Sequence, residues 1–147
     1  MATHSVESYE LDLPEGWSTR LLTVMAPIEK VGFKNANYPV HIAIGLSSFK
    51  RGQSFEAWAQ EQLDELEQQL KGVRILAQEP FTANGVEGQL AEYTHLSPDG
   101  QMLRQLIVFL PCGKKGLSAS VGDLMGPRFD KMRPGYLEIL ESLRMKP

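Results

Sequence analysis

The stretch VEGQLAEYTHLSPDGQMLRQLIVFLPCGKKGLSASV, residues 86–121, decides the fold of this chain. It contains three apolar segments, 86–94, 102–110 and 117–121, whose composition predicts strands. Two turn signals separate them, SPDG at 97–100 and GKKG at 113–116. Turns this short join antiparallel strands, so the stretch predicts consecutive hairpins in a mainly antiparallel sheet.

The residues before this stretch add further strands. Alternation of apolar and polar residues predicts strands at 9–13 and 18–25, the second with Leu22 and Val24 on one face, followed by a loop at 26–39. A strand predicted at 41–47 carries large apolar side chains on one face. Its other face carries only the small residues Ala43, Gly45 and Ser47. We expect another element to approach that face closely, either a helix of this domain or a ligand.

Two helices complete the pattern. Residues 55–70 have Ser54 as an N-cap and Gly72 as a C-terminal stop. Their apolar stripe consists of Phe55, Trp58, Ala59, Leu63, Leu66 and Leu70. A second helix is expected to begin near Pro134, because proline is tolerated in a first helical turn. With a further strand at 73–81, the sequence predicts a single α+β domain over residues 1–147, with a twisted, mainly antiparallel sheet of about six to seven strands flanked by two helices.

Composition excludes several classes of function. A net charge of −3 disfavours binding to nucleic acid or to anionic membranes. There is no secretion signal at the N-terminus and no run of about 18 apolar residues, so we expect a cytoplasmic protein without direct membrane insertion. The single cysteine excludes an intramolecular disulfide and a thiolate metal cluster.

No motif predicts catalysis, a metal or a cofactor. The three histidines, His4, His41 and His95, lack metal-ligand partners at i+3 or i+4. His95, beside a turn, is interpreted as a surface residue. A Cys–His pair including Cys112 would have to form in space, since no local spacing supports it. We therefore expect a binding protein and not an enzyme.

Two glutamines lie among apolar residues. Gln62 projects within the apolar stripe of the first helix, and Gln105 shares a strand face with Ile107 and Phe109. An unpaired buried amide costs about 1–3 kcal/mol, so each needs a partner. Either each amide bonds a group of its own domain, or it satisfies polar groups on a mostly apolar ligand.

Three short motifs resemble the DcrB-related family, which has a PsbP-like fold, and within it the Eag-type chaperones of type VI secretion effectors. The motifs are Leu13-Pro14-x-x-Trp17, Phe55-x-x-Trp58-x-x-x-Gln62-Leu63 and Met102-Leu103-Arg104-Gln105. The resemblance covers nearly the whole chain in the order and length of its elements.

The resemblance implies a cytoplasmic homodimer that holds the hydrophobic N-terminal transmembrane segments of a PAAR-containing effector before export. It implies that Gln62 and Gln105 contact the backbone of the bound helix. It also implies contacts from neighbouring positions on the sheet, namely Leu22, Val24, Ala43, Gly45 and Ile107. Two other functions stay open: an adaptor that binds a folded partner through its sheet, and an enzyme or ligand carrier with a closed pocket lined by His41 or His95 and Cys112.

Overall fold

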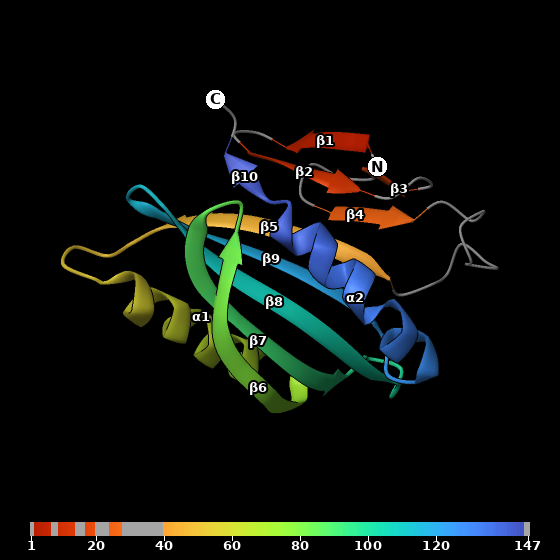
Figure 1. Cartoon of the computed structure of the whole chain (residues 1–147). Coiled ribbons are helices and arrows are strands. Elements are labelled where there is room, and N and C mark those ends of the chain that lie inside the picture. The colour runs from red at the N-terminus through yellow and green to blue at the C-terminus, as the bar shows by residue number, and fades with distance from the viewer. Residues whose placement is uncertain (1, 7–8, 14–16, 20–23, 28–39, 146–147) are drawn as a thin grey trace.

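The computed structural model describes residues 2–6, 9–13, 17–19, 24–27 and 40–145. Its elements, in chain order, are β1 (Ala2–Val6), β2 (Tyr9–Leu13), β3 (Trp17–Thr19), β4 (Val24–Pro27), β5 (His41–Ser48), α1 (Phe55–Gln69), β6 (Lys71–Ala83), β7 (Val86–Leu96), β8 (Met102–Cys112), β9 (Lys115–Leu124), α2 (Pro127–Glu141) and β10 (Arg144–Met145) (Figure 1).

Within these described ranges, seven strands form one sheet in the order β3-β4-β5-β9-β8-β7-β6, and every neighbouring pair is antiparallel. A smaller sheet has the order β1-β2-β10. The large sheet is strongly twisted (Figure 1). The predicted α+β fold, with its antiparallel sheet and two helices, is therefore confirmed, and the three strands of 86–121 are its neighbouring members β7, β8 and β9.

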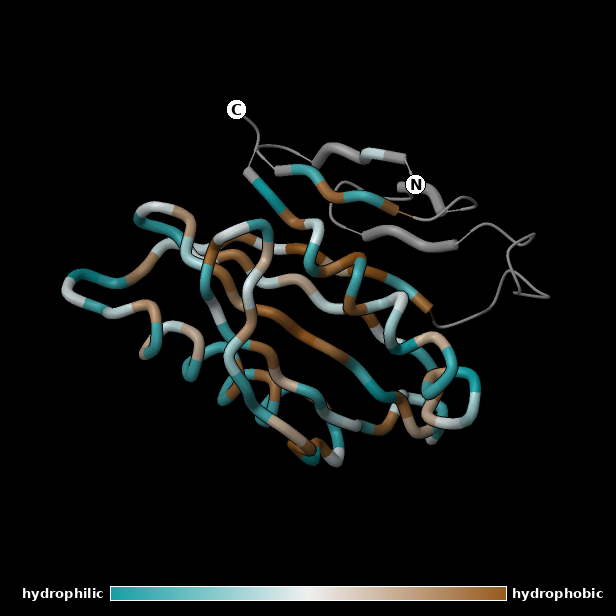
Figure 2. The backbone as a smooth tube through the Cα atoms, in the orientation of Figure 1, coloured by the Kyte–Doolittle hydropathy of each residue, from teal (hydrophilic) through white to brown (hydrophobic). Residues whose placement is uncertain are grey.

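The two helices pack on opposite faces of the large sheet. Alternate residues of each strand point to opposite sides, so each strand contributes side chains to both cores. One core lies between the sheet, α2 and β2, and includes Leu106, Val108, Phe129 and Tyr136. The other lies between the sheet and α1, and includes Trp58, Leu63, Tyr93 and Phe109. Figure 2 shows hydrophobic positions concentrated along the central strands between these two cores.

Helix α1 follows the sequence prediction closely. The Ser54 side chain accepts a hydrogen bond from the Ala57 backbone N–H at 3.1 Å, as an N-cap does. The predicted apolar stripe faces the sheet. Gly72 is not the helix stop, however: α1 ends at Gln69, and Gly72 lies in β6 with φ of 66°, where the pairing with β7 shifts register. Its conformational freedom serves a bulge.

Helix α2 begins earlier than predicted. Its first residue is Pro127, and Pro134 lies inside the helix. A proline does occupy the first turn of α2, but it is Pro127 and not Pro134. An internal proline removes one helical hydrogen bond, so long-range contacts must hold this helix together. Arg128, before Pro134, and Arg133, next to it, bond acidic residues of the sheet.

The N-terminal part differs most from the prediction. The single strand expected at 18–25 is wrong: Thr19 of β3 pairs with Met25 of β4, so the chain reverses within that segment. Strand β4 also takes the first two residues of the expected loop, while 28–39 lie outside the described residues. Strands β1 and β10 were not predicted. Strand β9 extends to Leu124, three residues beyond its predicted end.

Candidate functional site

Helix α1 covers only part of its face of the large sheet. It contacts β9 and β6, and Trp58 lies so close to Gly116 that an added Cβ there would be 2.4 Å from the indole ring. On the β5 side of the helix the sheet is less covered, and Ala43 and Gly45 are only half-buried. Among the described residues, this leaves an open strip of sheet beside α1.

Small residues form the floor of this strip. Ala43 pairs with Ser120, which pairs with Ile107, and in the next row Gly45 pairs with Ser118, which pairs with Phe109. Paired residues face the same side, so these side chains share the face on which α1 lies. Glycine, alanine and serine on two adjacent strands keep this surface low.

One side of α1 forms the wall. Gln62, Glu65, Leu66 and Gln69 border a cavity of about 150 Å³ whose base includes Ile107 and Ser118. A second cavity of about 200 Å³ continues along the helix and shares Gln62 and Glu65 with the first. We call this feature the α1 groove. Its wall is Gln62, Glu65, Leu66 and Gln69, and its floor consists of Ile107, Phe109 and Ser118 at the base of the first cavity together with the adjoining small residues Ala43, Gly45 and Ser120 of the open strip.

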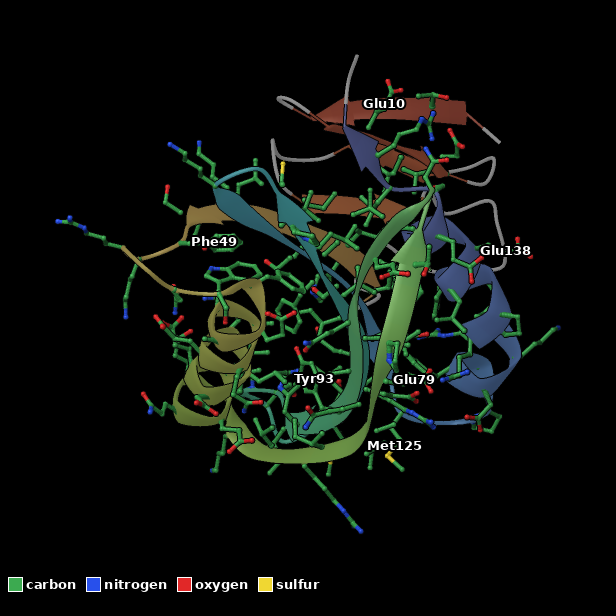
Figure 3. All side chains as sticks on the ribbon, turned by 60° about the vertical axis from the view of Figure 1, so that its left-hand side comes forward. Glu10, Phe49, Glu79, Tyr93, Met125 and Glu138 are labelled. Atoms are coloured by element: carbon green, nitrogen blue, oxygen red, sulfur yellow. The ribbon has the colours of Figure 1, made fainter. Side chains whose placement is uncertain are left out.

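Aromatic residues and polar contacts close the groove at the start of α1. The indole Nε1 of Trp58 donates to Ser47 Oγ at 2.9 Å, and its ring packs edge-on against Phe109. Phe49, labelled in Figure 3 beside the first turn of α1, lies 5.7 Å from the Trp58 ring between centroids. Lys50 pairs with Glu61 at 2.8 Å across this end. These contacts fix the orientation of the wall.

A buried polar cluster lies at the other end. The Tyr93 hydroxyl donates to Gln105 Oε1 at 3.2 Å, and Gln105 Nε2 lies 2.7 Å from His95 Nε2. The exposed fractions of Tyr93, His95 and Gln105 are 2%, 5% and 7%. Figure 3 shows Tyr93 between α1 and the sheet. The Gln105 amide thus has partners inside its own domain.

The interpretation of His95 as a surface residue is wrong. Strand β7 continues to Leu96, past the predicted end at 94, so His95 belongs to the sheet and not to the turn. It faces the same side as Tyr93 because the two are two positions apart. Burial lowers the pKa of His95 and raises that of Tyr93 to about 12, so both side chains are neutral hydrogen-bonding groups at pH 7.

The structure brings five of the predicted site residues to one face: Ala43, Gly45, Gln62, Gln105 and Ile107. Leu22 lies outside the described residues. The backbone of Val24 pairs with Ala43, while its side chain is outside the described part.

Sequence reasoning missed several groove residues. Ser118 and Ser120 alternate with buried Leu117, Ala119 and Val121, and this period-2 pattern could have identified a second small-residue face. Glu65 is an exposed side chain of α1 that borders both cavities. The floor therefore contains more hydroxyl groups than the expected apolar surface with a few amides.

Cys112 does not meet His41 or His95. It lies on the α2 side of the sheet, in a cavity with Leu117 and Leu143, whereas His41 and His95 lie on the α1 side. His95 pairs with Leu103, nine residues from Cys112 along β8, or about 30 Å. Burial also raises the pKa of the Cys112 thiol, which disfavours the nucleophilic thiolate.

Among the residues that the structure describes, no group of three His, Cys, Asp or Glu side chains could hold a metal ion. Neither described helix is long and apolar enough to cross a membrane.

Comparison with known proteins identifies the fold. Residues 9–121 match the model of the DcrB family. The cyanobacterial PsbP protein CyanoP from Synechocystis sp. PCC 6803 superposes with a TM-score of 0.69 at 12% identity, over 98% of this chain and 91% of its own. LpqN of Mycobacterium tuberculosis, involved in cell envelope biogenesis, gives 0.67 at 18% identity, over 98% and 88%.

The Saccharomyces cerevisiae Ran-binding protein Mog1p gives a TM-score of 0.58 at 12% identity, over 99% of this chain and 96% of its own. At such identities these similarities show the PsbP-like fold. No curated protein sequence matches the chain.

Proposed function

The chain belongs to the DcrB family, and from this premise we propose that it is a chaperone whose α1 groove binds and shields an apolar helix. The helix is an N-terminal transmembrane segment of a PAAR-containing type VI secretion effector, held before export. The chaperone works in the cytoplasm as a homodimer, and it binds its client without catalysis or a cofactor.

The observation that carries this proposal is the low floor of the α1 groove. Helices rich in small residues approach a surface closely when small residues lie opposite, and Ala43, Gly45 and Ser120 supply them. Each Å² of apolar helix surface removed from water contributes about 25 cal/mol. Gln62 lines the wall of the groove, which supports a role for its amide in bonding polar groups of the bound helix.

The test is co-purification with a transmembrane fragment of the effector, using a variant that fills the groove. Gly45→Leu places a large side chain on the floor, where an added Cβ would be 3.4 Å from Ser118 Oγ and meets no backbone. We expect the wild type to keep the fragment in solution and Gly45→Leu to lose it. Thr82→Leu, exposed on β6, is the matched control and should retain it. Thermal melting of both variants checks the fold.

Two results would refute the proposal: a wild-type protein that forms no complex with the fragment, or a folded Gly45→Leu variant that binds as well as the wild type.

A second candidate is an adaptor that binds a folded partner through the same sheet. The observation that favours it is the similarity to Mog1p, named a Ran-binding protein, over nearly the full length of both chains. A complex with a folded domain that contains no apolar helix, and that Gly45→Leu abolishes, would support this candidate over the chaperone.

A further inference from the structure

The polar cluster at the end of the α1 groove is held by close contacts on several sides. Gln105 lies across Gly122, where an added Cβ would be 2.9 Å from Gln105 Cγ and 3.0 Å from Cδ. Gly122 pairs with Gln105 on one side and with His41 on the other, so the amide reaches from β8 over β9 in the direction of β5. Its two polar atoms are held by Tyr93 and His95.

We propose that Tyr93 and His95 are positioning residues that hold the Gln105 amide across Gly122, and that protonation of His95 reorients this amide and weakens binding of an apolar helix in the α1 groove. This inference rests on the proposed function for its binding step, but its switching step is independent of any ligand.

The switching step follows from the donors and acceptors of the cluster. Because Gln105 Nε2 is a donor, His95 Nε2 at 2.7 Å must be the acceptor and therefore carries no proton in the neutral ring. A protonated ring has a donor on both nitrogens, so two donors would face each other. The amide must then rotate by half a turn, and the Tyr93 hydroxyl must change from donor to acceptor.

The surroundings of His95 offer a charged ring little compensation. Its Nδ1 is buried and has no hydrogen-bond partner of good geometry among the described residues. The nearby Leu96 backbone favours the charged ring, but burial outweighs it and lowers the pKa of His95. The nearest titratable groups on this face are Tyr93 and His41, and His41 acts against protonation of His95. Helix α1 carries one charged group of the groove wall on this face, the exposed Glu65. The remaining residues that the elements of this face present are uncharged: Leu103, Gly122, Leu124, Val73, Ile75, Leu66 and Leu70. Arg74 and Arg104 belong to the opposite face.

Ligand binding and protonation therefore oppose each other. An apolar helix that binds best when the Gln105 amide has the orientation held by neutral His95 disfavours the charged ring, which requires the other orientation. Binding of the helix therefore releases the proton from those molecules in which His95 is charged. The affinity for the helix is constant at a pH where His95 is neutral. It falls by up to tenfold per pH unit once the pH is below the pKa of His95 in the ligand-free protein.

The binding experiment uses a fluorescent peptide of about 20 Leu, Ala and Gly residues with two lysines at each end, a length that matches a membrane span. Its Kd is measured from pH 8 to pH 5. We expect the Kd of the wild type to rise at least fivefold over this range. His95→Gln keeps an acceptor for the Gln105 amide but cannot titrate, so it should retain the Kd at pH 8 and lose the dependence. His41→Gln should keep the dependence.

The second experiment needs no peptide. NMR titration of ¹⁵N-labelled protein should show His95 with its proton on Nδ1 at pH 8. The Gln105 side-chain amide signals should shift with the same pKa as the ring, and His95→Gln should abolish that shift.

The outcomes separate the two proposals. If the wild type binds no peptide at any pH, the chaperone function fails, while the NMR titration still decides the switch. If the peptide binds with a Kd that is independent of pH, or if His95→Gln keeps the pH dependence, the binding part of the inference is overturned. Gln105 signals that do not follow His95 overturn the switch itself.

Discussion

Two glycines on the same face of the large sheet show how differently one residue type is constrained. Gly116 lies directly under the Trp58 ring, whereas Gly45 pairs with Ser118 on the groove floor and has ordinary space above it. Neither needs a positive φ, because both lie in extended strands. The first glycine allows α1 to pack closely, and the second keeps the groove open.

We expect Gly116→Ala to lower the free energy of unfolding by about 1–3 kcal/mol, because the new methyl group must displace a closely packed indole ring. Gly45→Ala, the matched control, should change it by less than about 0.5 kcal/mol. Urea denaturation of both variants measures the difference. An equal loss in the two would contradict the assigned packing.

His95 makes stability depend on pH. Burial lowers its pKa in the folded state, so the unfolded chain, with a histidine pKa of about 6.5, binds the proton more readily. The free energy of unfolding should therefore be highest above pH 6.5 and fall as the pH drops below it, by at most about 1.4 kcal/mol per unit.

Urea denaturation of the wild type and His95→Gln at pH 7.5 and pH 5.5 checks this expectation. The difference in stability between the two proteins should narrow or change sign at the lower pH. If the difference in stability between the two proteins is the same at both pH values, the His95 ring has the same pKa in the folded and unfolded states, which would contradict the expectation.

At the scale of elements, buried acids of the sheet hold α2 in place. Glu92 is 3% exposed and accepts from Arg133 Nη2 of α2 at 2.7 Å and from Arg104. Asp123, fully buried, accepts from Arg128 at 2.8 Å and from the Tyr136 hydroxyl at 3.2 Å. These contacts join both halves of the helix to the sheet, which is how a helix interrupted by a proline stays ordered.

We expect Glu92→Gln to cost about 2–4 kcal/mol, because it leaves two arginines without their carboxylate. Burial acts to raise the pKa of Glu92, but the hydrogen bonds from Arg133 and Arg104 outweigh burial and hold it below its usual value. Asp130→Asn, which removes an exposed partner of Arg104, should cost no more than about 0.5 kcal/mol. Thermal melting at pH 7 compares the two.

Some of these elements could be predicted from the sequence and others could not. Helix α1 and the three strands of 86–121 could be predicted because cap, stripe and turns are local signals. The start of α2 could not, since the sequence offers two prolines and only the contacts of Arg128 and Phe129 decide between them. Strand β10 could not be predicted because it has only two residues and pairs with β2, which is far from it in sequence.

At the scale of the whole molecule, ion pairs join strand β10, near the C-terminus, to strand β2, near the N-terminus. Arg144 of β10 bonds Glu10 and Asp12 of β2, and Ser142 accepts a hydrogen bond from the Asp12 backbone N–H at 2.8 Å. Strand β2 in turn buries Leu11 and Leu13 in the core beneath α2. The small sheet therefore closes that core from the side.

We expect Arg144→Ala to open the small sheet locally without unfolding the large one. Hydrogen exchange of the backbone amides of Leu11 and Leu13 should become faster, while that of Leu106 and Val108 in β8 stays unchanged. Arg51→Ala, at an exposed turn, is the control and should leave both sets unchanged. Uniformly faster exchange in both sheets would show that the two sheets unfold as one unit.

The sequence by itself determined the fold class, the hairpins of 86–121, helix α1 with its cap, and the two faces of β5. These depend on period, turn residues and caps, all of which act over a few positions. Only the tertiary structure decided what lies next to what. Gln62 borders the groove while Gln105 bonds Tyr93 and His95, and Ser118 and Ser120 join Ala43 and Gly45 in one floor. Such relations depend on strand order and on where α1 crosses the sheet. Both are selected by the packing of residues that are distant in sequence, and no local pattern encodes them.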